Sequence, residues 1–146
     1  MIWLLRHAEA ADGEPDAERP LTEKGERQAR TAGRALAVLE VRIDACVSSP
    51  KVRAVQTAEL ACEPLGVDVQ VDDRLAGGPF DPFEVAEGRG EHVLLVGHDP
   101  DFSMAVHNVT GGQVRMKKGG VAGIDEGEMI VLMRPRELAA IATSYG

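Results

Sequence analysis

Two arginines and two histidines in this sequence each follow the end of a short apolar run: Arg6, His7, Arg53 and His98. Guanidinium groups bind phosphate oxygens through pairs of hydrogen bonds and stay charged at neutral pH. A neutral imidazole can attack phosphorus and carry the phosphoryl group covalently, and a second imidazole can stabilise charge on the phosphoryl oxygens. Together these residue types indicate phosphoryl chemistry, provided that the fold brings them to one place.

The apolar runs are short and rich in branched residues, which is typical of buried parallel strands. Strands are predicted at residues 2–5, 43–47, 67–71 and 93–96. Helices are predicted at residues 22–40, 50–61, 100–111 and 135–142. A hairpin is predicted from residues 121–125 and 128–133, which flank Glu126-Gly127.

This alternation of strands and helices predicts a single α/β domain over residues 1–146. The expected architecture is a three-layer sandwich with a mostly parallel central sheet, helices on both faces and a C-terminal hairpin. In such sheets, ligands bind beyond the carboxyl ends of the strands. Because the two arginines and two histidines follow strand ends, we expect them to converge at one edge of the sheet.

The helix predicted at residues 22–40 has recognisable features along its length. Thr22 is the expected N-cap, and Gly33 is expected to permit close packing. The apolar face is predicted to consist of Ala29, Ala32, Leu36 and Leu39. The next helix is expected to begin with a serine cap and with Pro50 in its first position. Residues 76–82, AGGPFDP, are expected to form a mobile loop.

The charge balance limits the partners of this chain, because 24 acidic and 16 basic residues give a net charge of −8. Such a surface repels nucleic acid and anionic membranes, so neither is expected as a partner, and an anion must bind in a local basic pocket. Cys46 and Cys62 are expected to be buried reduced thiols. No signal peptide or spanning helix is predicted, and a cytoplasmic location is expected.

Four separated motifs resemble the histidine phosphatase superfamily, which has the phosphoglycerate mutase-like fold. They are LLRHAEA, ERPLTEKGERQA, SSPKVRAVQTA and VGHDP, in the order found in that superfamily and spanning Ile2 to about Pro100. The short chain and the RPLT segment look most like the compact SixA-type phosphohistidine phosphatases, which lack a helical insert over the site.

The resemblance implies a role for each matching residue. His7 would be the nucleophile that forms a phosphohistidine, and Arg6 and Arg53 would hold the phosphoryl oxygens. His98 would complete the pocket and stabilise the transition state, and Arg19 would reach the substrate phosphate. The family uses no metal cofactor. The implied partner is a phosphorylated substrate, with a phosphohistidine protein as the expected case.

Two departures from the family pattern bear on the substrate. Ala8 stands where the signature has Gly, so the backbone is expected to approach the phosphate less closely. Larger members place a Glu after a Leu beyond the third strand, whereas Leu75 is followed by Ala76-Gly77-Gly78. The conceivable substitutes for this proton donor are Glu9, Asp81 and Asp99. An alkoxide leaving group needs such a donor, whereas an imidazole leaves readily once protonated, so the site is expected to favour P–N bonds or acidic leaving groups.

Several alternatives remain open at the level of sequence. The chain could be a small-molecule phosphomonoesterase of the same superfamily or a catalytically idle module that binds phosphorylated partners. A metallophosphatase would draw on His7, Glu9, His98 and Asp99, but the neighbouring arginines argue against a divalent cation. The physiological substrate, the proton donor, the oligomeric state and any gating by residues 76–82 are not specified by these patterns.

Overall fold

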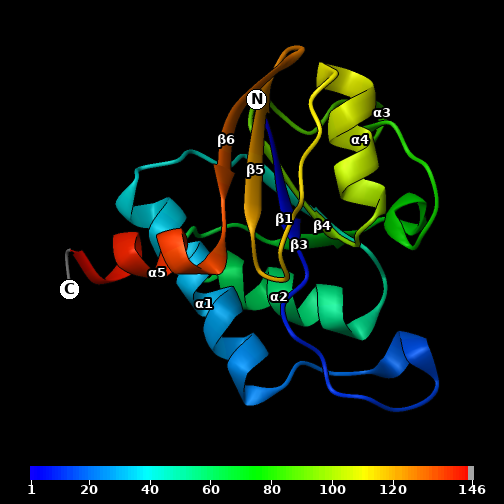
Figure 1. Cartoon of the computed structure of the whole chain (residues 1–146), viewed down its shortest axis with the longest axis vertical. Helices are drawn as coiled ribbons and strands as arrows, with labels where there is room; N and C mark the ends of the chain where they lie inside the picture. The colour runs from blue at the N-terminus through cyan, green and yellow to red at the C-terminus, as the bar shows by residue number, and fades with distance from the viewer. Residues whose placement is uncertain (145–146) are drawn as a thin grey trace.

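Strand β1 (Ile2–Arg6) forms from the first apolar run and lies inside a six-stranded sheet of order β3-β2-β4-β1-β5-β6. The computed structural model describes residues 1–144 of the chain (Figure 1). The parallel part of the sheet consists of β1, β4 (Val93–Gly97), β2 (Ala45–Ser48) and β3 (Val69–Val71). The predicted hairpin is confirmed as β5 (Val121–Asp125) and β6 (Glu128–Met133), and β5 pairs with β1 in the antiparallel direction.

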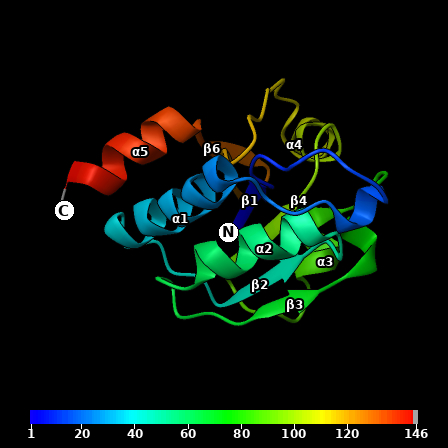
Figure 2. The ribbon, with the colours of Figure 1, turned by 90° about the horizontal axis from the view of Figure 1, so that it is seen from below.

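Helices cover both faces of the sheet, as expected for a three-layer α/β sandwich (Figure 2). One face carries α1 (Glu23–Val38), α2 (Val52–Cys62) and α5 (Pro135–Ser144). The other face carries α3 (Pro82–Ala86) and α4 (Asp101–Thr110). Two single turns of 3-10 helix, η1 (Asp16–Glu18) and η2 (Asp73–Leu75), interrupt the loops. Within residues 1–144, no helix combines the length and the apolar character that crossing a membrane requires.

The alternation of side chains along β1 divides the core into two halves. Trp3 and Leu5 pack in the cluster that faces α1, α2 and α5. Ile2 and Leu4 pack in the cluster that faces α3 and α4. Because successive side chains of a strand point to opposite faces, a strand buried on both faces must be apolar at every position. This explains the uninterrupted apolar run that precedes the first arginine.

Helix α1 follows its prediction except at its carboxyl end. The hydroxyl of Thr22 accepts a hydrogen bond from the backbone N–H of Gly25, which confirms the N-cap. A Cβ added to Gly33 would lie 2.2 Å from the backbone oxygen of Ala61, so only glycine permits this approach of α1 to α2. Leu39 is 46% exposed and lies outside the buried face, because the helix ends at Val38.

The predicted start of the second helix was wrong. Pro50 does not occupy the first position of α2, because the helix begins at Val52 with Lys51 as its N-cap. The hydroxyl of Ser49 accepts a hydrogen bond from the backbone N–H of Lys51 at 3.2 Å, so this serine orders the turn before the helix rather than capping it. The loop predicted at residues 76–82 ends in the first residue of α3, which Asp81 caps by accepting from the N–H of Phe83.

Candidate active site

Three neighbouring strands end at the same level and bring the predicted site residues to one edge of the sheet. Arg6 lies opposite Gly97 in the pairing of β1 with β4. The ladder continues one step further, because the N–H of His7 donates to the carbonyl of Gly97 at 2.8 Å. The N–H of Ser49 similarly donates to the carbonyl of Val96 at 2.9 Å. The residues that follow β1, β2 and β4 are therefore neighbours, as the sequence predicted.

The two histidines form the centre of this edge. Their ring centroids lie 5.1 Å apart, and the side chains are buried, with His7 7% and His98 6% exposed. Nδ1 of His7 lies 2.8 Å from the backbone oxygen of Ala8. A carbonyl can only accept, so Nδ1 carries the proton and Nε2 keeps its lone pair. This tautomer presents a nucleophilic nitrogen.

Both imidazoles are held neutral at physiological pH. Burial, together with the positive charges of Arg53, Arg6 and Lys118, lowers the pKa of His7 to about 4, against the bond to Ala8, which raises it. Burial lowers the pKa of His98 to about 3, with added contributions from His7, Arg53 and Lys51. The cations beside these rings, Arg6, Arg53 and Lys118, make the site electropositive, and their field attracts an oxyanion.

His98 is oriented by a serine from the neighbouring strand end. Its Nε2 lies 2.8 Å from Oγ of Ser49, which also accepts the backbone N–H of Lys51. Where the Ser49 hydroxyl donates its proton to Nε2, the ring proton lies on Nδ1. That Nδ1 is buried and has no hydrogen-bond partner within residues 1–144. A phosphoryl oxygen would satisfy it.

Arg6 is anchored by the loop that precedes β5. Its Nη1 donates to the backbone oxygen of Met116 at 2.8 Å. Its backbone is held by the same loop, because its N–H donates to Gly120 and its carbonyl accepts from Gly119. Its Nε is buried and has no hydrogen-bond partner in the described part of the chain.

Arg53 lies in the first turn of α2 and points at the loop after β1. The side chain is buried, with 7% exposure. Its Nη1 donates to the backbone oxygen of Asp16 at 2.9 Å, and its Nη2 lies 3.2 Å from Oδ2 of that residue. Lys51 and Arg19 also contact the Asp16 carboxylate, at 3.7 and 3.0 Å. One exposed carboxylate therefore gathers three cations at the edge of the site.

Thr57 connects the segment that follows β1 to the helix that carries Arg53. This buried hydroxyl donates to the backbone oxygen of Arg53 at 2.7 Å and accepts from the N–H of Ala8 at 3.0 Å. Thr57, Ser49 and Asp16 were not identified from the sequence as site residues. The signal for Thr57 was its place one turn after Arg53, where its side chain reaches the same surface of α2.

Comparison with known proteins identifies the family. A model described as the histidine phosphatase superfamily (branch 1) matches residues 2–92. The chain belongs to the histidine phosphatase superfamily. An uncharacterised protein of Picosynechococcus is 34% identical over 140 residues, an alignment that covers 86% of this chain and 85% of that protein.

Solved structures of the superfamily share the fold over nearly the whole chain. The protein histidine phosphatase SixA complexed with tungstate has a TM-score of 0.80 at 26% identity and covers 94% of this chain and 98% of that one. A SixA protein from Agrobacterium tumefaciens has a TM-score of 0.77 at 25% identity, with 92% and 97% covered. These similarities confirm the expected SixA-type branch of the superfamily and the α/β sandwich.

The alanine in the superfamily signature does not obstruct the site. Ala8 is fully buried, and its methyl group packs in a small cluster with Leu21 and Ala29. Its N–H is bound to Thr57, away from a ligand. The departure from glycine is therefore accommodated by the core between β1 and α1.

The three carboxylates considered as proton donors are all engaged in local hydrogen bonds. Glu9 accepts from the hydroxyl of Thr22 at 2.8 Å, and Asp81 caps α3. Asp99 accepts from the N–H and hydroxyl of Ser103 in α4. Among residues 1–144, no cluster of three or more His, Cys, Asp or Glu side chains is arranged to hold a metal ion.

Two hollows on the surface differ in their relation to the site. A cavity of about 680 Å³ lies between α3, α4 and the β5–β6 turn, and its lining includes none of the predicted site residues. A groove of about 530 Å³ is bordered by Arg6 itself. This groove, unlike the cavity, is bordered by a side chain that the sequence predicts to bind phosphate.

Proposed function

We propose that this protein is a phosphohistidine phosphatase that works through a phosphohistidine intermediate on His7. The observation that carries the proposal is the state of this ring, because Nδ1 is tied to the backbone oxygen of Ala8 at 2.8 Å and Nε2 is left as a free, unprotonated nucleophile. The similarity to the protein histidine phosphatase SixA supports the choice of substrate class.

The first step transfers the phosphoryl group to the enzyme. The lone pair of Nε2 of His7 attacks phosphorus, and the bond from phosphorus to the leaving nitrogen breaks, with its electron pair moving to that nitrogen. Arg6 and Arg53 hold the phosphoryl oxygens, and Arg53 exchanges its contact with Asp16 for the substrate. The Nδ1–H of His98 donates to another oxygen, which stabilises the charge that develops there.

The second step returns the enzyme to its starting state. Water attacks the phosphorus of the intermediate, the bond to Nε2 breaks, and its electron pair returns to the ring of His7. Inorganic phosphate is released. Arg19 donates to the backbone oxygen of Ala11 at 2.8 Å and contacts the Asp16 carboxylate that Arg53 also binds. These contacts place the positive charge of Arg19 at the entrance to the site.

The choice of leaving group is supported by the state of the three carboxylates considered as proton donors. Glu9, Asp81 and Asp99 are engaged in local hydrogen bonds, so an alkoxide would leave without a positioned acid. An imidazole protonated on its second nitrogen departs as a neutral molecule and needs no such acid. The site is therefore matched to P–N bonds.

The decisive experiment is rapid-quench labelling with a phosphohistidine peptide. We expect an acid-labile label on His7 that forms and decays within the turnover time and is absent in His7→Ala. In steady state, the phosphohistidine peptide should turn over faster than an alkyl phosphate monoester. Faster hydrolysis of the alkyl ester would favour a small-molecule phosphomonoesterase, and stoichiometric binding without turnover would favour an idle binding module; either result would overturn the proposal.

A further inference from the structure

A basic groove borders the site on the side of α1 and α5. Its lining includes six cations and a single carboxylate, Glu9, although acidic residues outnumber basic ones in the chain as a whole. The cations come from the end of β1, the first turn of α1, the loop before β5 and the junction of β6 with α5: Arg6, Lys24, Lys117, Lys118, Arg134 and Arg136. Such a concentration of one charge on an acidic protein marks a site for an anion.

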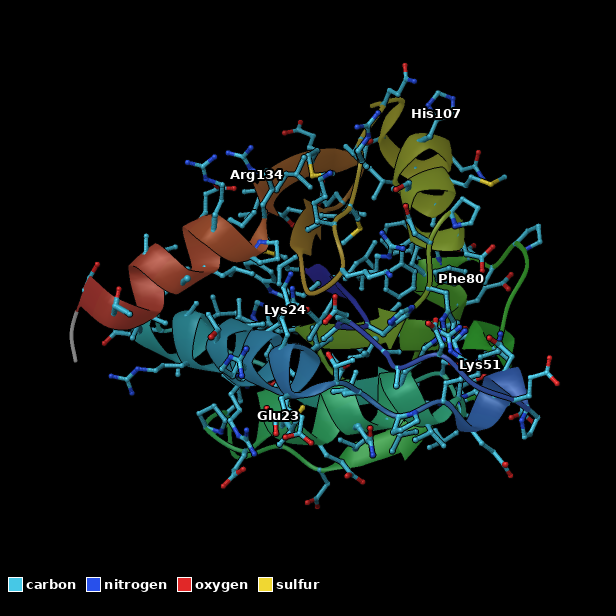
Figure 3. All side chains as sticks on the ribbon, turned by 60° about the horizontal axis from the view of Figure 1, so that its bottom comes forward. Glu23, Lys24, Lys51, Phe80, His107 and Arg134 are labelled. Carbon is cyan, nitrogen blue, oxygen red and sulfur yellow. The ribbon has the colours of Figure 1, made fainter. Side chains whose placement is uncertain are left out.

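The groove and the catalytic edge share two positively charged residues. Arg6 belongs to both, because it borders the groove and its charge lowers the pKa of His7. Lys118 does the same from the opposite loop. Figure 3 shows Lys24 and Arg134 on the side where α1 and α5 begin, away from Lys51 at the other end of the site. An anion in the groove would therefore extend from a phosphoryl group bound beside His7.

The cations of the groove are arranged differently from those of the catalytic edge. Lys24, Lys117 and Lys118 are exposed and form no ion pair with a carboxylate within residues 1–144. Arg134 and Arg136 both contact the carboxylate of Glu137, at 2.8 and 3.7 Å. A site for one small phosphate would bury and orient its cations, as Arg53 is buried. Exposed cations spread over three segments instead fit several separate carboxylates along a chain, through attraction that does not need fixed geometry.

We propose that this groove binds the aspartate and glutamate side chains that flank the phosphorylated residue of a protein substrate. This inference rests on the proposed function, because it assigns the groove to the same substrate. It predicts that the enzyme distinguishes phosphorylated proteins by the acidity of the sequence around the phosphohistidine.

The test uses two peptides of equal length that carry a non-hydrolysable phosphonate analogue of phosphohistidine. One has three glutamates beside the analogue and the other has three glutamines. Binding is measured by fluorescence anisotropy at low salt. We expect the acidic peptide to bind about tenfold more tightly, from three charge contacts of ordinary surface strength. The preference should shrink as salt is added, because exposed charges are screened.

A matched pair of triple variants locates the effect. Lys24→Gln with Lys117→Gln and Arg136→Gln should abolish the preference for the acidic peptide. The control removes the same total charge from exposed arginines outside the groove, at Arg30, Arg42 and Arg74, each changed to Gln. The control should keep the preference.

Three results would overturn the proposal. Equal binding of the two peptides by the unaltered protein would show that the groove does not select acidic sequences. If both triple variants lost the preference equally, the net charge of the protein rather than the groove would explain it. Tripolyphosphate that binds in a groove-dependent way, with no peptide preference, would assign the groove to a small polyanion. Anisotropy reports binding and not hydrolysis, so loss of the groove preference is distinguishable from a failure to turn over phosphohistidine.

Discussion

The Asp16 carboxylate lies 3.2 Å from Nη2 of Arg53, on the guanidinium proposed to hold a phosphoryl group. Lys51 and Arg19 contact the same carboxylate, and the arginine contacts lower the pKa of Asp16, so it is ionised at neutral pH. We infer that this exposed carboxylate competes with an anionic substrate for the positive charge of Arg53.

Replacing Asp16 by asparagine should strengthen the binding of tungstate or phosphate. We expect the inhibition constant to fall about two- to fivefold, the range for removal of one exposed charge interaction. The control is Glu91→Gln, which neutralises an exposed carboxylate just before β4, at the opposite edge of the sheet. Unchanged or weaker inhibition of Asp16→Asn would indicate that the carboxylate orients Arg53 rather than competing with the ligand.

Replacing Arg53 by lysine should lower kcat/KM with a phosphohistidine peptide by about 10²-fold, as removal of one preorganised donor to a developing oxyanion does. A lysine keeps the charge but loses the two-pronged geometry with which Arg53 now binds the backbone and side chain of Asp16. The matched control, Arg30→Lys, exchanges an exposed arginine of α1 and should leave kcat/KM unchanged. Equal kinetics for the two variants would exclude a bidentate role for Arg53.

Stability should decrease as the pH falls from about 6.5 toward 5. The folded protein holds the pKa of His7 at about 4 and that of His98 at about 3, whereas both titrate near 6.5 when unfolded. The unfolded state therefore binds more protons in this window, so the free energy of unfolding rises with pH, by at most about 1.4 kcal/mol per pH unit and histidine. Urea denaturation at several pH values measures it.

The two carboxylates with strongly lowered pKa values do not account for a loss of stability between pH 6.5 and 5. Asp72 and Glu137 have pKa values lowered to about 2 by Arg74 and Arg134, so their contribution is present above their usual pKa range and is lost only at lower pH. His98→Gln should flatten the dependence between pH 6.5 and 5, and His107→Gln, at an exposed position of α4, should not. A flat curve for the unaltered protein would contradict the lowered histidine pKa values.

Replacing Thr57 by valine should destabilise the fold by about 1–3 kcal/mol, the cost of leaving buried backbone groups without their partners. The change keeps the shape but removes both the donor to Arg53 and the acceptor for the N–H of Ala8. Thr57→Ser retains the hydroxyl and should recover most of the difference. Urea denaturation compares the variants, and equal free energies of unfolding for valine and serine would show that the hydroxyl contributes nothing.

Periodicity and strand-end chemistry were sufficient to predict the layers and the centre of the site. The run from Ile2 to Leu5 is apolar at every position because both faces of β1 are covered. His7 and His98 could be placed together because residues that follow parallel strands share one edge. These inferences need only the direction and the burial of strands.

Contacts between loops and the ends of helices could not be predicted in the same way. The role of Asp16 depends on the path of the loop after β1, which brings it to Arg53, a residue 37 positions away. The start of α2 was placed too early because a serine and a proline resemble a helix start, whereas Ser49 is held by His98 and by the backbone of Lys51. At these positions, hydrogen bonds to residues distant in the sequence outweighed the local tendency to start a helix.

The hydroxyl of Thr57 fixes the strand that carries the nucleophile against the helix that carries Arg53, entirely within the protein core. Most of the groove beside the site is formed by other segments, at the start of α1, the loop before β5 and the start of α5, and Arg6 is shared between the groove and the site. Reaction centre and recognition surface can therefore diverge separately during evolution. Substitutions at Lys24, Lys117 or Arg136 would therefore change which protein substrates are bound, while the residues that carry out the proposed reaction stay the same.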